Sequence, residues 1–165
     1  MAIETIIPTK TGICLILGGQ ASYPKQGYFK NRRDKKLMLK IQNDEAIIEK
    51  LHSYLISEFP RLKFKVKIPL KKLFPEPKNK WLKSIRSYGH ADIAVFRHGR
   101  LITIIEPGGF FHVSDPKQKI RDSKKDRICR ENKVNCLRIF NNVVNGDLGN
   151  PKFRRLLKKK FYGVV

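Results

Sequence analysis

Two acidic residues, Asp92 and Glu106, lie in neighbouring apolar segments of the chain. Asp92 is near the start of ADIAVF, Glu106 ends LITIIE, and the ionisable residues between them are confined to the turn 97–100. An acidic residue in an apolar segment needs a compensating partner, because burying an unpaired charge is costly. If both carboxylates lie at the same end of a strand pair, they could bind a divalent metal ion that faces a phosphate. The alternative for Asp92 is that it caps a turn.

The length of the turn decides whether these two side chains share a face of the sheet. A two-residue loop at 98–99 would pair Asp92 with Ile105 and place Glu106 on the opposite face, since side chains alternate along a strand. A three-residue loop at 98–100 would pair Asp92 with Glu106, and its glycine can supply the positive φ that such loops need. A shared metal therefore predicts a loop of odd length or a bulge.

Hydrophobic periodicity predicts an α/β fold with these residues on central strands. Helices are expected where apolar residues recur three or four apart, and strands where they alternate or run together between turn residues. The expected elements in chain order are a buried strand 13–17, a helix 43–59, strands 62–68, 90–96 and 101–106, a helix 116–132, a strand 134–140 and a basic helix 151–161. The segment 69–87, rich in proline and lysine, is expected to be an irregular insertion, and 141–150 is expected to form turns.

The two central strands are apolar on both faces, which is typical of a sheet covered by helices on both sides. Strand pairing should stop at Glu106, because Pro107 lacks an amide donor. The following helix should begin at Pro116 with Asp115 as its cap, and much of its surface should face water. Its apolar anchors are expected to be Ile120, Ile128 and Cys129.

The chain is strongly basic, with 36 Lys and Arg against 14 Asp and Glu, a net charge of +22 and a pI near 10.2. Such a chain attracts polyanions and should bind nucleic acid with strong salt dependence. A membrane is the competing polyanion, but we find no apolar run of about 18 residues, no lipidation signal and no signal peptide. The three cysteines, without CxxC spacing, argue against a zinc site or a disulfide framework. We therefore expect a cytoplasmic protein without a membrane partner.

The length of 165 residues predicts one globular domain, in which a basic N-terminal extension 1–42 precedes a core 43–165. Within the extension, basic residues alternate with aromatic ones, which suits backbone phosphates and stacking on bases. In strand 62–68 three lysines share one face, a pattern that would also discourage edge-to-edge association. The residues predicted to contact nucleic acid are Lys25, Lys30, Arg32, Arg33, Lys35, Lys36, Lys63, Lys65, Lys67 and Lys124. An ordinary solvated surface is the alternative for the extension.

The order helix, strand, strand, strand, helix, strand, with Asp on the second strand and Glu ending the third, resembles the restriction-endonuclease-like superfamily. Within it the chain is most similar to the very-short-patch repair endonucleases and related small nucleases of mobile elements. The matching residues, within 43–140, are Glu106, Gly109 and His112, then Arg121, Asp122, Lys125 and Asp126, then Leu137, Arg138 and Ile139. The resemblance implies a mixed sheet of four to five strands flanked by helices. It also implies a Mg2+-dependent endonuclease or nickase that acts on double-stranded DNA, with a homodimer expected if both strands are cut.

The resemblance further implies roles for individual residues. Asp92 and Glu106, with the Pro107 carbonyl and with Glu45 as a further acid, would hold Mg2+, for which Mn2+ could substitute. The metal would polarise the scissile phosphate and lower the pKa of a bound water. His112 would position that water or protonate the leaving oxygen. The alternatives are that Glu45 is an ordinary first-turn acid and that His112, within FFHV, is structural.

The chain departs from the superfamily at Gly108, where a lysine, or an aspartate in this branch, usually follows the Glu by two residues. Lys125, His112 or Asp122 could supply the missing catalytic function, or the protein could bind nucleic acid without cutting it. Asp122 could also pair with a cation on the helix surface. Lys125 lies one helical turn from Asp122, and if both take part, the helix must present that face to Asp92 and Glu106. Lys124, about 100° away around the helix, should contribute to binding alone.

Overall fold

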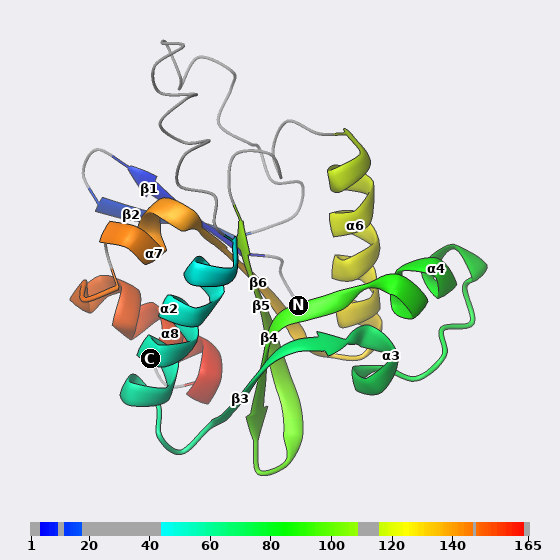
Figure 1. The fold of residues 1–165 in the computed structure, drawn as a ribbon, viewed down its shortest axis with the longest axis horizontal. Coiled ribbons are helices and arrows are strands. Elements are labelled where there is room, and N and C mark those ends of the chain that lie inside the picture. Colours follow the sequence, from blue (N-terminus) through cyan, green and yellow to red (C-terminus); the bar gives the residue numbers. More distant parts are fainter. Residues whose placement is uncertain (1–3, 10–11, 18–43, 109–115, 147, 164–165) are drawn as a thin grey trace.

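The computed structural model describes residues 4–9, 12–17, 44–108, 116–146 and 148–163. Within these residues a mixed six-stranded sheet, in the order β2-β1-β6-β5-β4-β3, separates two layers of helices (Figure 1). The strands are β1 Glu4–Thr9, β2 Gly12–Leu17, β3 Lys63–Pro69, β4 His90–Arg97, β5 Arg100–Gly108 and β6 Asn135–Phe140. The helices are α2 Asp44–Glu58, α3 Leu70–Leu73, α4 Lys80–Tyr88, α6 Pro116–Glu131, α7 Asn141–Gly146 and α8 Pro151–Tyr162.

The predicted α/β class, with a mixed sheet flanked by helices, is confirmed. Strand β6 runs parallel to both of its neighbours, β1 and β5, while the β1–β2, β4–β5 and β3–β4 pairs are antiparallel. Strand β1 was not expected from the sequence, and it lies between β2 and β6. The segment 1–42, expected to be an extension, thus contributes two strands to the central sheet. None of the described helices is long and apolar enough to cross a membrane.

Each face of the sheet carries its own apolar cluster. Helices α2, α7 and α8 cover one face. Leu51 and Leu55 of α2, and Phe59 directly after it, are fully buried there. Helices α3, α4 and α6 cover the other face around Ile104 and Ile128 (Figure 1). Burial of a large apolar side chain stabilises the fold by about 1.5–3 kcal/mol, so these two clusters hold the strands in place.

The expectation of an irregular insertion at 69–87 is wrong, because this segment forms α3 and α4. The side chain of Asn79 accepts a hydrogen bond from the Trp81 amide at 2.9 Å and caps α4. Leu82 and Ile85 then bury one face of the helix. The prolines lie before this cap, where they do not interrupt the helix, and the lysines occupy its solvated face.

Three smaller expectations are also corrected. The segment 141–150, expected to form turns, begins with α7, which buries Val143 and Val144. Strand β5 does not end at Glu106 but continues beside β6 to Gly108, because a proline removes only its own amide donor. Ile120 is 53% exposed, whereas the predicted anchors Ile128 and Cys129 are buried. Asp122 and Lys125 occupy the inward positions of the first half of α6 instead, because both have ionic partners there.

The prediction of an odd-length loop or a bulge in the central hairpin is confirmed, and the structure has the bulge. The loop has two residues, His98 and Gly99, both with positive φ (51° and 78°), as a type I′ turn requires. The register then shifts, so that Phe96 faces Leu101 but Val95 faces Thr103. The extra residue in β5 restores the alignment that a two-residue loop alone would lose. As a result Asp92 and Glu106 come to lie side by side at the same end of the two strands.

Candidate active site

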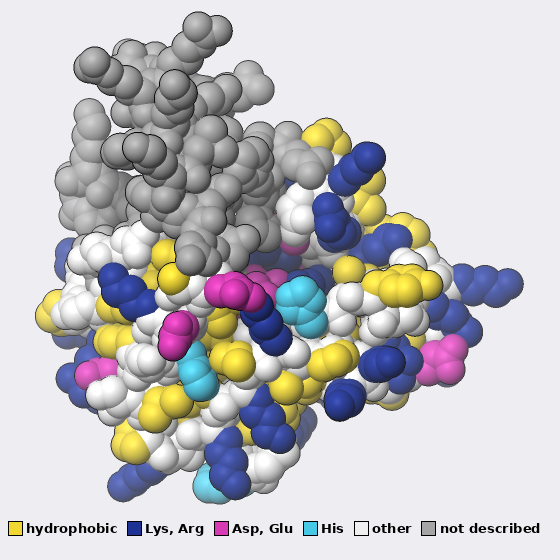
Figure 2. All heavy atoms as spheres, viewed as in Figure 1, with side chains coloured by type: hydrophobic (Ala, Val, Ile, Leu, Met, Phe, Trp, Pro, Cys, Tyr) yellow, Lys and Arg dark blue, Asp and Glu magenta, His cyan; other side chains and the backbone are white. Residues whose placement is uncertain are grey.

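A cleft of about 670 Å³ opens where β4 begins and where β5 and β6 end, and Asp92, Glu106 and Pro107 line it. Its walls are the first turns of α2, the last turns of α4 and the N-terminal half of α6. Figure 2 shows carboxylate, histidine and lysine side chains gathered together near the centre of this face. Because β4 is antiparallel to β5, the start of one strand and the end of the other meet at this edge.

Glu106 and Lys125 form a buried ion pair at the base of the cleft, with side chains only 5% and 11% exposed. The Lys125 ammonium donates to Glu106 Oε2 and also to the His90 carbonyl oxygen at 3.0 Å. Burial alone would lower the pKa of Lys125, but attraction to the nearby Glu106 and Asp92 carboxylates raises this pKa above its usual value. Lys125 is therefore a permanent cation, which cannot serve as a general base near neutral pH.

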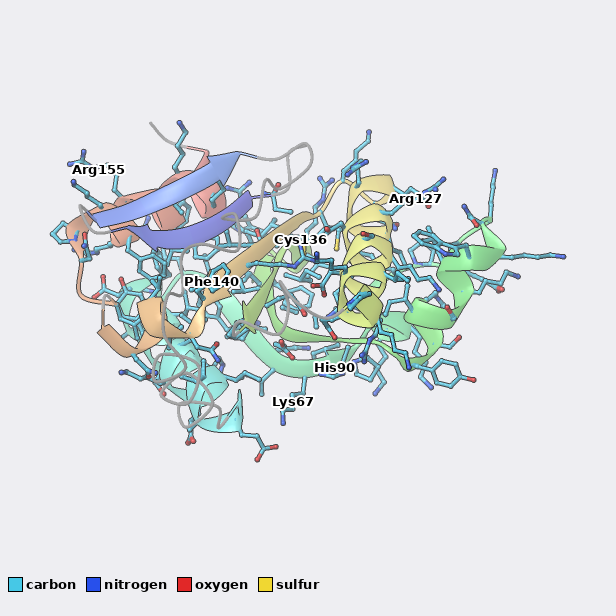
Figure 3. The ribbon with its side chains drawn as sticks, turned by 90° about the horizontal axis from the view of Figure 1, so that it is seen from above. Lys67, His90, Arg127, Cys136, Phe140 and Arg155 are labelled. Atoms are coloured by element: carbon cyan, nitrogen blue, oxygen red, sulfur yellow. The ribbon has the colours of Figure 1, made fainter. Side chains whose placement is uncertain are left out.

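Asp92 lies beside this pair with a side chain that is 17% exposed. Its backbone amide approaches Glu106 Oε1 at 3.4 Å, and its Oδ1 is 3.2 Å from His90 Nε2. The His90 side chain is half exposed and lies near Lys67 between α2 and α6 (Figure 3). His90 was not among the residues predicted for the site, and the structure places its imidazole in the cleft beside Asp92.

Glu45 of α2 and Lys67 of β3 line the wall of the cleft opposite α6. They form an exposed ion pair at 2.6 Å, which lowers the pKa of Glu45 chiefly through the hydrogen bond from Lys67. Lys67 has φ of 50° in the middle of β3, between the paired residues Val66 and Ile68. A residue other than glycine held in this region costs about 1–3 kcal/mol and is found more often at functional sites than elsewhere. The backbone of β3 at Lys67, in the strand next to the one that carries Asp92, is thus strained.

Asp122 is directed away from the cleft and toward Arg138 of β6. Its Oδ2 is 3.9 Å from Arg138 Nε, its backbone carbonyl accepts from Arg138 Nη2 at 3.2 Å, and Gln118 donates to Oδ1 at 2.9 Å. Asp126 also pairs with Arg138, at 2.6 Å. The structure therefore does not bring Asp122 together with Asp92 and Glu106. Its geometry fits an ion pair that holds α6 on β6.

Replacing Arg138 by methionine should strongly destabilise the protein, since two largely buried carboxylates would lose their common partner. We expect the free energy of unfolding to fall by about 3–5 kcal/mol, measured by urea denaturation followed by circular dichroism. Arg127→Met is the matched control, because Arg127 pairs with Glu131 on the exposed side of α6. That variant should lose less than about 1 kcal/mol. Equal losses would show that the Arg138 pairs do not hold α6.

Of the described basic residues predicted to contact nucleic acid, Lys67 and Lys124 line the cleft, and Lys63 and Lys65 are exposed outside it. Lys124 hydrogen-bonds Ser84 Oγ at 3.2 Å and lies 5.1 Å from the centre of the Trp81 ring. The other residues predicted to contact nucleic acid lie outside the described part of the chain, namely Lys25, Lys30, Arg32, Arg33, Lys35 and Lys36. The catalytic candidate His112 and the predicted helix cap Asp115 also lie outside it.

Arg121 and Asn141 are among the cleft residues that were missed as site candidates. Arg121 had been noted only for the family resemblance, although it lies one helical turn before Lys125 on the cleft side of α6. Asn141 directly follows β6 and is 6% exposed, and its side-chain amide has no hydrogen-bond partner among the described residues. An unsatisfied buried amide costs about 1–3 kcal/mol. The position of Asn141 at the end of a parallel strand was the one sequence signal that could have identified it.

The donor set fits a hydrated magnesium ion. Within the described residues there is no group of three or more His, Cys, Asp or Glu side chains arranged to hold a metal. Mg2+, however, commonly uses one or two carboxylates and takes its other ligands from water and substrate phosphate. Asp92 and Glu106 supply those carboxylates, and Pro107, whose carbonyl is an oxygen donor, lines the same cleft. Neither sulfur nor a histidine cluster is present among these lining residues to favour a softer metal.

Comparisons with known proteins identify no relative of this chain. No protein-family model, no curated protein and no solved structure matches this chain. The function must therefore be inferred from the cleft itself, in which two carboxylates, a buried ammonium and a basic rim lie at one edge of the sheet.

Proposed function

We propose that the protein is a Mg2+-dependent DNA endonuclease or nickase with a core of the restriction-endonuclease type. The single observation that carries the proposal is the convergence of Asp92, Glu106 and Lys125 from two strands and a helix at the base of one cleft. Residues Lys67, Arg121 and Lys124 around this cleft, and the net charge of +22, support a polyanionic substrate.

Asp92 and Glu106 would hold the magnesium ion, which when bound polarises a phosphate and lowers the pKa of a coordinated water. Lys125, kept protonated by its surroundings, would donate to a phosphate oxygen and stabilise the negative charge that develops on the phosphoryl group. Its hydrogen bond to the His90 carbonyl fixes the ammonium independently of Glu106. The cation would thus be in place before the substrate arrives.

The remaining cleft residues would bind and orient the DNA strand. Arg121 and Lys124 extend from α6 on one wall, and Lys67 extends from β3 on the other. Cations on both walls can contact successive phosphates of one strand, which fixes the strand in register with the carboxylates. The imidazole of His90, beside Asp92, would accept a proton from the attacking water or pass one to the leaving oxygen.

The second candidate is a nucleic-acid-binding protein with the same fold and no catalysis. Both carboxylate oxygens of Glu106 are already engaged, one by Lys125 and the other by the Asp92 amide. Gly108, in the position where the resemblance leads one to expect a lysine or an aspartate, favours the same candidate. This candidate predicts salt-dependent DNA binding and no cleavage of the DNA when Mg2+ is present.

Supercoiled plasmid incubated with the protein and Mg2+ should be converted to nicked or linear DNA, and EDTA should stop the conversion. Agarose gel electrophoresis separates the three forms of the plasmid. Mn2+ should support the reaction in place of Mg2+, because it too prefers carboxylate ligands. A plasmid that shifts in mobility at low salt but stays covalently closed in both metals would select the non-catalytic candidate.

A further inference from the structure

An aromatic side chain without a packing role lies at the mouth of the cleft. Tyr88, the last residue of α4, is 89% exposed, the largest exposed fraction among the big apolar side chains that the structure describes. It lines the cleft together with Asp92, which follows it by four residues. So exposed an aromatic ring contributes little to folding, because its apolar surface remains in water.

The backbone that carries Tyr88 is firmly held. The amide of Gly89 donates to the Ile85 carbonyl at 2.7 Å, and the Gly89 carbonyl accepts from the Leu70 amide at 2.9 Å. A side chain at Gly89 would place its Cβ only 2.4 Å from the Ile85 oxygen and 2.9 Å from a Leu70 methyl group. The backbone at Gly89 is therefore packed tightly against Leu70 of α3 and Ile85 of α4. This packing fixes the backbone from which the Tyr88 side chain extends.

A second, smaller hollow of about 410 Å³ adjoins the cleft, and Tyr88 lines both. Lys67, Tyr88 and His90 line both hollows, while Lys71 lines only the second. No carboxylate is among the described residues that line this smaller hollow. It is therefore a cationic depression lined by an aromatic ring, and it shares residues with the site proposed to cut the phosphodiester bond.

We propose that Tyr88 stacks on an unpaired base of DNA next to the scissile phosphate, and that Lys71 and Lys67 bind the phosphate of that nucleotide. The placement next to the scissile bond rests on the proposed function, whereas the stacking does not. An aromatic ring beside cationic side chains is the combination that binds single-stranded nucleic acid. In a paired duplex both faces of each base are covered by stacking, so a protruding ring gains its contact where a base is unpaired. The substrate class is thus DNA with an unpaired segment.

Binding can be tested without cleavage, by fluorescence anisotropy of labelled DNA with the full-length protein in EDTA. Two probes of the same sequence are used, a fully paired duplex and a duplex with an internal unpaired segment. Wild-type protein should bind the second probe more tightly. Tyr88→Ala should weaken binding to that probe by about 5- to 100-fold and leave binding to the paired duplex nearly unchanged. Tyr88→Phe should bind as the wild type does, because its ring is retained.

Two further variants distinguish the contribution of base stacking to DNA affinity from the contributions of positive charge and of exposed apolar surface. Lys71→Ala should weaken binding to both probes and reduce the salt dependence, as the loss of one phosphate contact requires. Ile56→Ala, at a half-exposed position on α2 that does not line either hollow, should change neither probe. Equal affinities of Tyr88→Ala and wild type for the unpaired probe would overturn the proposal. Tyr88-dependent binding without metal-dependent cleavage would instead refute the proposed hydrolysis and leave the stacking site intact.

Discussion

Asp92→Asn and Glu106→Gln should each reduce Mg2+-dependent plasmid cleavage by about 100-fold or more, while DNA affinity stays equal or rises. The loss follows because a neutral amide is a poor replacement for a carboxylate that holds Mg2+, and without the metal the charge that develops on the phosphate is not offset. Affinity should not fall, because removal of a negative charge from a cleft that receives phosphates relieves repulsion. Gel assays of nicking and anisotropy in EDTA measure the two effects separately.

Glu131→Gln is the matched control, because Glu131 is a solvent-accessible carboxylate on the outer side of α6, paired only at the surface with Arg127. It should cleave at the wild-type rate. Glu106→Gln also removes the charge partner of buried Lys125, so circular dichroism must show that this variant is folded. Asp92→Asn leaves that pair intact and is the cleaner test. Wild-type cleavage by Asp92→Asn would show that Asp92 does not bind the metal.

Lys125→Met should reduce cleavage by about 100-fold or more and weaken DNA binding only slightly. Lys125 is 9% exposed at the base of the cleft, where its charge can act on the transition state but contributes little to the rim. Methionine retains the apolar stem, so it disturbs the packing between α6 and the sheet less than alanine would. Single-turnover cleavage and anisotropy in EDTA distinguish the two effects.

Lys124→Met is the control next to it in the chain. The Lys124 ammonium lies over the Trp81 ring and bonds Ser84, on the α4 side of the cleft rather than at Glu106. Its replacement should weaken binding and lower the salt dependence, with single-turnover cleavage of bound DNA unchanged. Similar small effects from both variants would identify both lysines as general phosphate contacts. The cation missing at Gly108 would then have no replacement on α6.

The sequence by itself determined the central part of the fold. Apolar periodicity located α2 and α8, and apolar runs located β4, β5 and β6, because these elements bury apolar side chains on one face or both faces. The start of α6 was located by Pro116, since half of its buried side chains are charged. The elements that were missed, α3, α4, α7 and β1, are short or carry prolines and asparagines beside them. Their stability comes from packing on neighbouring elements rather than from a strong local pattern.

The register of the hairpin was determined by a chemical requirement together with the sequence. The turn 97–100 permits more than one loop length, and alternation alone cannot choose between them. The demand that Asp92 and Glu106 share a face predicted a loop of odd length or a bulge, and β5 contains a bulge. Acidic residues in apolar strands thus carried information that secondary-structure propensities do not contain.

Only the tertiary structure decided which polar side chains become partners. Asp122 and Lys125 are both on the inward side of α6, yet one meets Arg138 and the other meets Glu106. Packing between distant elements also left Tyr88 outside the core, and it brought Asn141, at the end of β6, into the cleft without a hydrogen-bond partner among the described residues. Local sequence specifies the face of an element on which a residue lies. The partner it meets depends on how elements distant in the chain pack together, because ion pairs and hydrogen bonds form over only a few ångströms.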